Sequence, residues 1–403
     1  MKIIVAPRLF DGERVRENLA VAFDTAVEEI APFEVLETRY PNAEVVRLAD
    51  REVLLPGLVN PHVHLEFGAN TTHLRYGDFM GWLHSVIERR DELVEACKAA
   101  CYKRQIDAML RSGTTAFGAV SSYGKELIAC KAAPQRVVFF NEAIGSAPAA
   151  VDALYSDFMQ RLEASEAAAS DRFVPAVAIH APYSVHPVLM RRILAETKGK
   201  LLSAHFMESP AEKAWLEAGE GDFKPFFENF LKQSAPLQSP GEFLEALDRP
   251  ALLTHAVQAG DALLEKIAGA GHTVTHCPRS NRLLGCGRLR IERLRDLDIP
   301  WLLGTDGLSS NTSLNLWEEM RAALMLHREA PLELFAAELL RAATSRAADA
   351  LKLPVGRIKE GALADLITVT LPDAPDRAEA LPLQTLLHAD TVTKLYIQGK
   401  QHV

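Results

Sequence analysis

The chain has 403 residues, of which 48% are hydrophobic and 24% charged, a composition that excludes an intrinsically disordered protein. Its formal net charge of −9 provides no basic face, so we expect no nucleic-acid partner and favour a small-molecule substrate. The sequence shows no signal-peptide pattern and no apolar run of about eighteen residues or more, which predicts a cytoplasmic protein without a membrane partner.

Both ends of the chain read as short strands and turns without helical periodicity. The candidate strands there are 3–5, 18–23, 33–37, 45–47, 366–370 and 393–397. We therefore expect residues 1–55 and 354–403 to combine into one small β-sandwich domain built from both termini.

From about residue 110, short apolar runs alternate with longer amphipathic stretches, the pattern of repeated βα units, and we expect residues 56–353 to form one domain. The predicted strands are 53–58, 114–116, 137–140, 174–179, 201–204, 251–254, 273–275 and 301–304. The predicted helices between them include 88–111, 151–170, 187–197, 240–246, 262–268 and 291–297. This α/β pattern predicts a (β/α)₈ TIM barrel, whose catalytic groups would lie at the C-terminal ends of the strands.

The five cysteines are scattered along the chain and odd in number, which argues against a disulfide framework. Cys97 and Cys101 lie four residues apart in a predicted helix. We expect these two cysteines to be buried or reduced.

Two histidines close the first predicted barrel strand. His62 and His64 form an H-x-H pair on an extended segment, so their imidazoles point the same way and can reach one metal ion. Taken alone, the pair could equally be two polar residues on a strand edge.

Further polar residues follow three later strands. His205 ends one strand and Glu208 follows three residues later, where a carboxylate could shuttle protons. His255 ends another strand, and Asp306 lies between glycines after the last one. A buried, unpartnered aspartate is costly, so Asp306 requires a cation or a donor. Each residue alone could be structural, but their shared strand-end positions indicate one site.

The order and spacing of these residues resemble the amidohydrolase superfamily, in the mononuclear branch that includes S-adenosylhomocysteine and guanine deaminases and triazine hydrolases. The motifs that carry the resemblance are segments 56–64, 277–281, 304–316 and 361–366. Binuclear members carry a lysine at the end of strand four, where this chain has His180. The resemblance thus implies one divalent metal ion, with zinc as the usual metal and iron as an alternative. The implied ligands are His62, His64, His205 and Asp306.

The same resemblance implies a hydrolytic deaminase acting on C–N bonds of cyclic amidines. Glu208 would protonate the ring nitrogen beside the amino-bearing carbon. Asp306 would pass a proton from the attacking water to ammonia, and His255 would hold that water.

The segment 66–83 after the H-x-H pair is similar to that of the aminodeoxyfutalosine deaminases of the alternative menaquinone pathway. Their substrate is an adenosine whose ribose bears a carboxyphenyl-ketone chain, and aromatic rings with a nearby cation would suit it. The expected substrate contacts are His180, Glu66, Arg75, Trp82, Arg279 and Ser309. His180 could instead be structural, and Trp82 could merely cover the barrel mouth.

Several alternatives remain open at this point. The substrate could be S-adenosylhomocysteine, methylthioadenosine or adenosine, or the chain could be a guanine deaminase or a triazine-type hydrolase. A non-catalytic barrel protein would lack a ligand or a proton shuttle. The amphipathic stretch 316–327 could cover the barrel or pack on a second copy of the chain. The sequence therefore leaves the choice between a monomer and a homodimer open.

Overall fold

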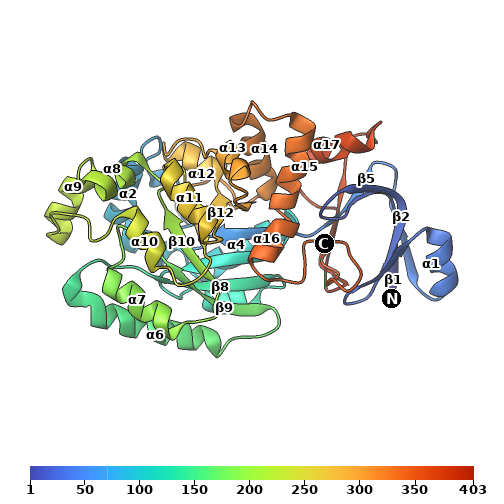
Figure 1. Ribbon diagram of the computed structural model, residues 1–403. Coiled ribbons are helices and arrows are strands. Elements are labelled where there is room, and N and C mark those ends of the chain that lie inside the picture. Colours follow the sequence, from blue (N-terminus) through green and yellow to red (C-terminus); the bar gives the residue numbers. More distant parts are fainter. Residues whose placement is uncertain (70) are drawn as a thin grey trace. The chain divides into compact units, whose positions relative to one another are not determined.

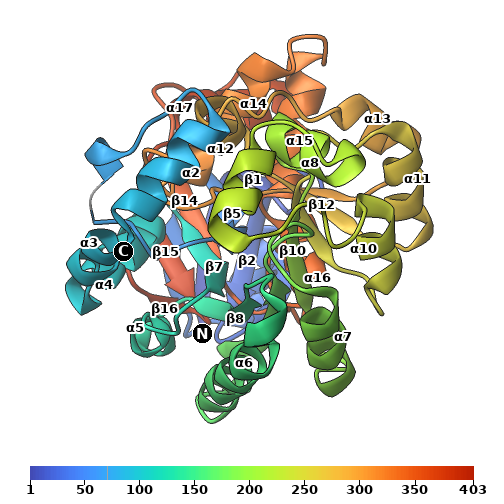
Figure 2. The same cartoon turned by 90° about the vertical axis from the view of Figure 1, so that its left-hand side faces the viewer.

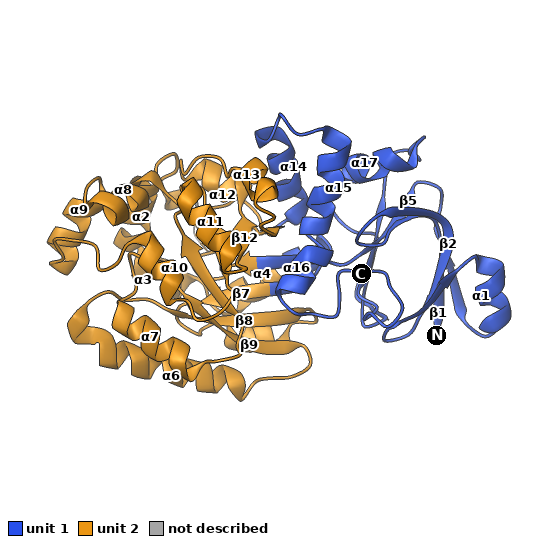
Figure 3. Ribbon diagram, viewed as in Figure 1, with its two compact units in different colours: residues 1–61, 107–117, 315–403 blue, residues 62–106, 118–314 orange. Residues whose placement is uncertain are grey.

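The computed structural model describes residues 1–69 and 71–403, so Asn70 in the predicted substrate segment lies outside the described residues. The chain divides into two compact units (Figure 3). The first comprises residues 1–61, 107–117 and 315–403, and the second 62–106 and 118–314. The domain limits expected at 55 and 354 stay a prediction. No helix among the described residues is long and apolar enough to cross a membrane.

A mostly antiparallel sheet is formed from both ends of the chain, as the sequence predicted, in the order β16-β15-β14-β5-β1-β2-β3 with β4 paired to β1. Phe23 from the N-terminal end meets Tyr396 from the C-terminal end edge-to-face in its core, with ring centroids 5.4 Å apart. Burying such a side chain contributes about 1.5–3 kcal/mol. The strands are β1 Lys2–Phe10, β2 Val15–Phe23, β3 Val27–Ala31, β4 Glu44–Arg47, β5 Glu52–Pro56, β14 Leu366–Thr370, β15 Lys394–Ile397 and β16 Lys400–Gln401.

Two segments of these flanks differ from the prediction. The strand expected at 33–37 is wrong, because helix α1 (Phe33–Arg39) occupies this stretch. Its buried Leu36 packs with Ile3 and Ala22 of the sheet. The C-terminal flank also contains a helix, α17 (Leu381–His388). Tertiary packing overrode the weak local pattern in both segments.

The second sheet is a nearly closed barrel whose eight strands run in sequence order from β6 to β13, which confirms the predicted TIM barrel (Figures 1 and 2). Strand β8 is buried along its whole length, as expected of a barrel strand covered on both faces. The strands are β6 Leu58–Val63, β7 Thr114–Ser121, β8 Arg136–Ala143, β9 Phe173–Ile179, β10 Leu202–Phe206, β11 Leu252–His255, β12 Thr273–His276 and β13 Trp301–Leu303.

The first barrel strand does not lie where the sequence placed it. The predicted strand 53–58 covers β5, which belongs to the terminal sheet, and the barrel strand β6 begins after Gly57. The Gly57 N–H donates to the Asp365 carbonyl oxygen at 2.9 Å. A Cβ on Gly57 would lie 2.0 Å from Thr115 Oγ1, so this crossing point has no room for a side chain.

Helices follow the barrel strands, but the single helix predicted at 88–111 is wrong. It is split at Cys97, where the chain leaves helical geometry. Cys97 and Cys101 are buried, as expected, but they form a disulfide, so the alternative that they are reduced is wrong. The helices are α2 Phe79–Glu88, α3 Arg90–Ala96, α4 Ala99–Arg111, α5 Leu127–Ala132, α6 Val151–Glu166, α7 Pro187–Glu196, α8 Pro210–Ala218, α9 Phe223–Phe226, α10 Pro240–Ala246, α11 Asp261–Gly269, α12 Pro278–Leu283, α13 Ile291–Asp296, α14 Leu316–Leu326, α15 Leu332–Ala342 and α16 Ser345–Ala350.

Candidate active site

The four predicted metal ligands lie together at the C-terminal ends of barrel strands, within the second unit. Their ligand atoms all lie within 4.8 Å of one another. Asp306 Oδ1 lies 3.6 Å from the Nε2 atoms of both His62 and His64. The Nε2 atoms of His64 and His205 are 3.1 Å apart. Ligands about 2.1 Å from one tetrahedral cation lie about 3.4 Å from each other, so these distances fit a shared metal ion.

The outer nitrogens of two imidazoles are engaged elsewhere, which leaves their Nε2 atoms facing the cluster. His205 Nδ1 donates to the His180 carbonyl oxygen at 2.9 Å, and His62 Nδ1 lies 3.2 Å from Thr254 Oγ1. Such hydrogen bonds fix the tautomer and ring orientation of metal-binding histidines. The structure thus presents a set of donors suited to a divalent cation.

Burial keeps these imidazoles neutral. It lowers the pKa of His64 to about 4 and the pKa of His205 well below its ordinary value, with neighbouring imidazoles adding to both changes. Burial alone would raise the pKa of Asp306, but His62 Nε2, 3.6 Å from Oδ1, and the imidazoles of His64 and His255 hold it well below its usual range. Neutral imidazoles and an ionised carboxylate are the protonation states that bind a metal.

Asp306 is held in place from its outer side. Its Oδ2 accepts hydrogen bonds from the hydroxyls of Ser280 at 2.8 Å and Ser310 at 2.6 Å. The residue adopts a left-handed conformation with φ of 58°. A Cβ on the following Gly307 would lie 2.9 Å from the Cβ of His64, so this close approach requires glycine. Oδ1 is thereby directed toward the histidines.

The turn between β10 and α8 positions Glu208. Buried Glu212 accepts the backbone N–H groups of Met207 at 3.0 Å and Glu208 at 2.6 Å, while Met207 takes a left-handed φ of 48°. The Ser209 hydroxyl caps α8 directly after the turn. Burial raises the pKa of Glu208 well above its ordinary value, and the Asp306 and Glu212 carboxylates add to the rise. This environment therefore favours the neutral, protonated form of Glu208.

His255 lies beside Glu208 because Phe206 and His255 are paired across β10 and β11. Its Nδ1 donates to Asn281 Oδ1 at 2.8 Å, so Nε2 faces Glu208 Oε1 at 3.5 Å. Burial lowers the pKa of His255 to about 4. Glu208, His255 and Asp306 together have ligand atoms within 4.8 Å of one another. Proton donor and acceptor groups are thus grouped against the ligand cluster.

Three of the predicted substrate residues are brought close to the candidate metal site. They are His180, Trp82 and Ser309. The His180 ring is 5.0 Å from the His205 ring, and its Nδ1 is hydrogen-bonded to the Ser184 hydroxyl. Trp82 Nε1 donates to the Ser309 carbonyl oxygen at 2.7 Å. Helix α2 is thus tied to the loop that carries Asp306.

The other three predicted substrate residues contact protein groups. Glu66 is buried and accepts the backbone N–H groups of Ser122 and Tyr123. Arg75 pairs with Glu88 at 2.9 Å with 57% of its side chain exposed. Arg279 donates to the Ser313 hydroxyl at 3.0 Å. Substrate binding by these residues stays a prediction.

Glu142 and Cys286 were missed in the sequence. The buried Glu142 carboxylate lies 3.7 Å from His205 Nδ1 and accepts a hydrogen bond from the Ser122 hydroxyl. Cys286 Sγ lies 3.9 Å from Glu208 Oε1. The position of Glu142 at the C-terminal end of β8, where catalytic groups lie in such barrels, was a usable signal for the first, whereas local sequence offered none for the second.

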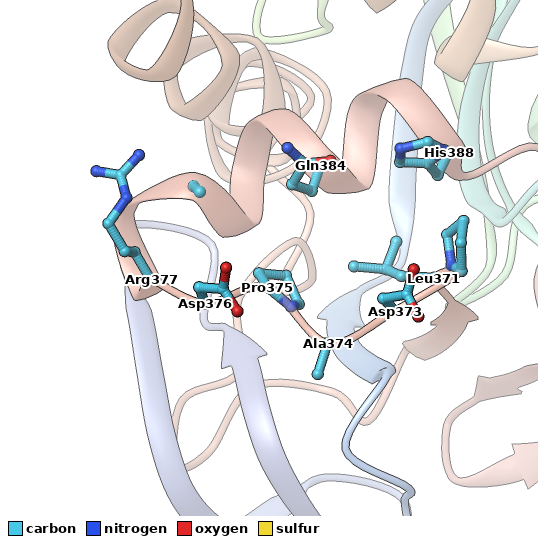
Figure 4. Close-up of a pocket in the computed structure, with 10 residues that line it drawn as sticks. Leu371, Asp373, Ala374, Pro375, Asp376, Arg377, Gln384 and His388 are labelled. Atoms are coloured by element: carbon cyan, nitrogen blue, oxygen red, sulfur yellow. The ribbon is translucent and has the colours of Figure 1, made fainter.

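A separate pocket of about 410 Å³ belongs to the first unit (Figure 4). It lies between the loop after β14 and helix α17, and its polar lining comes from Asp373, Asp376, Arg377, Gln384 and His388. None of these residues was predicted from the sequence to belong to the functional site. We therefore assign the candidate active site to the strand-end cluster of the second unit.

Comparisons with known proteins agree with this geometry. The model of the Amidohydrolase family matches residues 53–402. An aminodeoxyfutalosine deaminase of Nitratiruptor sp. is 43% identical over the full length of both chains. An adenosine deaminase of Helicobacter pylori is 34% identical over 96% of this chain and 95% of its own. The crystal structure of Helicobacter pylori aminofutalosine deaminase with methylthio-coformycin covers 100% of both chains, with a TM-score of 0.94 and 33% identity.

Proposed function

Because the chain belongs to the amidohydrolase family and is a hydrolase of C–N bonds, we propose that it deaminates the purine ring of a nucleoside. The proposed reaction converts 6-amino-6-deoxyfutalosine and water into futalosine and ammonia. The observation that carries this proposal is the grouping of Glu208, His255 and Asp306 within 4.8 Å beside three imidazoles. The similarity to the Nitratiruptor enzyme supports the substrate.

The family is metal-dependent, and we propose zinc as the metal. When bound, a divalent cation would lower the pKa of a coordinated water to about 7. The residues that would hold it are His62, His64, His205 and Asp306.

The surrounding residues would move the protons. Protonated Glu208 donates to the ring nitrogen beside the amino-bearing carbon, which makes that carbon electrophilic. Asp306 accepts one proton of the attacking water and delivers it to the departing amino group, which leaves as ammonia. The hydroxyl proton of the new C–O bond then returns Glu208 to its acid form. His255 Nε2 faces this site and accepts a hydrogen bond from the water.

Deamination of a panel of four nucleosides and one free base tests the proposal. Aminodeoxyfutalosine, methylthioadenosine, S-adenosylhomocysteine, adenosine and guanine are compared by ammonia release, with metal content measured on the same sample. We expect the highest kcat/KM for aminodeoxyfutalosine. Preference for guanine would contradict the substrate, and a metal-loaded protein that deaminates none of the five would contradict the reaction.

Adenosine and methylthioadenosine form a second candidate substrate class. The similarity to the Helicobacter pylori adenosine deaminase favours them, as does the methylthio-coformycin held by the aminofutalosine deaminase structure. The same panel separates the two classes.

A further inference from the structure

A series of aromatic rings leads away from the candidate metal site. The ring of Tyr183 is 6.0 Å from that of His180, and the ring of Phe223 is 4.8 Å from that of Tyr183. Burial raises the pKa of Tyr183 well above its ordinary value, and the Glu212 and Glu208 carboxylates add to the rise, which puts its hydroxyl in the field of the proposed acid. Tyr183 thus connects the site with helix α9.

The series continues outward on the segment after α8. Phe226 lies 6.3 Å from Phe223, and Phe230 stacks on Phe226 with centroids 5.7 Å apart and planes at 11°. Helix α9 passes here into a π-helical turn, Phe227–Leu231, which ends at Lys232 in a left-handed conformation. Such turns often occur at functional sites. We call Tyr183, Phe223, Phe226 and Phe230 the aromatic track.

Helix α2 packs against this segment. Phe79 lies 6.0 Å from Phe223, and His84 lies 6.1 Å from Phe226. The same helix carries Trp82, whose indole is bonded to Ser309 in the Asp306 loop. Figure 2 views the barrel end-on and shows the yellow-green segment that includes α9 in front of the strand ends. Ring contacts therefore run without a break from His180 to Phe230, through the fully buried ring of Phe223.

The outer rings of the track contribute little to the core. Phe227 fills that role, since it is buried and stacks flat on Trp215 at 4.9 Å. Phe230, in contrast, is 68% exposed, and the neighbouring Leu231 and Leu237 are exposed as well. A cluster of exposed apolar side chains that adjoins a polar site is typical of a ligand-binding surface.

We propose that the outer rings of the aromatic track, Phe226 and Phe230, bind an aromatic substituent carried on the ribose of the nucleoside, and so set the preference for substituted over unsubstituted adenosine. This inference rests on the proposed function and assigns the substituent to a segment outside the predicted loop 66–83. Aromatic rings whose centroids lie about 4.5–7 Å apart stabilise each other, and each ring would change affinity by about twofold to tenfold.

Two nucleosides with the same purine test the proposal: adenosine and 5′-phenylthioadenosine. The ratio of their kcat/KM values is measured for the metal-loaded wild type, Phe226→Ala and Phe230→Ala. We expect the ratio, phenylthio over plain, to fall about fivefold in each variant. Phe230→Tyr keeps the ring and should keep the ratio, whereas Phe230→Leu should lower it. Leu334→Ala is the matched control, since Leu334 is 72% exposed in the first unit.

An unchanged ratio, within twofold, in both alanine variants overturns the proposal. Calorimetric Kd values for both nucleosides are measured in parallel, so that the track is tested even without turnover. If the wild type binds both nucleosides but deaminates neither, the proposed function fails and the Kd ratio decides about the track. If the wild type binds 5′-phenylthioadenosine no more tightly than adenosine, the proposal is also overturned. If Phe226→Ala does not fold, the result for Phe230→Ala alone tests the proposal.

Discussion

Two buried clusters in the second unit carry ionisable groups whose charged forms have opposite signs. In the histidine cluster, burial lowers the pKa values of His64 and His205, and these imidazoles are neutral. In the glutamate cluster, burial raises the pKa of Glu66 well above its usual range and the pKa of Glu126 to about 7. Burial therefore removes charge from both clusters.

The consequences for function differ. A neutral imidazole keeps a lone pair that can bind a cation, and the Asp306 carboxylate beside it stays ionised. A protonated carboxyl loses charge and becomes a hydrogen-bond donor, which suits a structural role between loops. Burial thus prepares the histidine cluster to bind a metal and the glutamate cluster to pack between loops.

Removing a metal ligand should produce the largest effect. His205→Ala deletes one of three imidazoles, so we expect loss of bound metal and a fall in kcat/KM of about 10³-fold or more, equivalent to about 4 kcal/mol of transition-state stabilisation. Glu126→Gln, in the glutamate cluster, is the control and should retain one metal ion per chain. Elemental analysis and ammonia release on the same samples measure both. If Glu126→Gln also loses the metal, the distinction between a metal-binding histidine cluster and a structural glutamate cluster is wrong.

Glu208→Gln should have the next largest effect. The amide keeps the shape but cannot donate the acidic proton, so we expect retained metal and a fall in kcat of about 10²- to 10⁴-fold. Glu217→Gln, exposed on the same helix α8, is the control. Steady-state kinetics with metal analysis provide the measurement, and full activity of the Glu208 variant would refute its role as the acid.

The glutamate cluster should appear in the pH dependence of stability. A carboxyl whose pKa rises from 4.5 to about 7 on folding binds more protons in the folded than in the unfolded chain, so it makes the free energy of unfolding fall as the pH rises through this range. Glu126→Gln should remove a contribution on the order of 2 kcal/mol between pH 5 and pH 8. Urea unfolding of both metal-loaded proteins at the two pH values measures it. Parallel pH profiles would rule the contribution out.

Arg75→Ala should have the smallest effect and would sharpen the boundary of the site. Its exposed pair with Glu88 is worth less than about 1 kcal/mol, so thermal unfolding should barely change. Because the structure pairs Arg75 with Glu88 at the surface, we also expect less than about a threefold change in kcat/KM for aminodeoxyfutalosine, against the prediction from the sequence that Arg75 contacts the substrate. A tenfold loss with the carboxylated substrate, absent with adenosine, would establish Arg75 as a contact to its tail.

The alternation of apolar runs and amphipathic stretches was sufficient to predict the barrel. The same runs located His62, His205 and His255, because parallel strands bring their C-terminal ends together and each of these residues lies at or near such an end. The terminal sheet also followed from its strand patterns, although the chain crosses between the sheets at Gly57 rather than within one strand.

Other features were decided only by the tertiary structure. The disulfide between Cys97 and Cys101, the approach of Glu142 to His205 and the stacking of Phe230 on Phe226 have no periodic signature in the sequence. Local sequence determines which face of an element is buried, since that depends on the period of the backbone. Which side chains from separate loops then meet depends on how the elements pack, and that information is distributed over the whole chain.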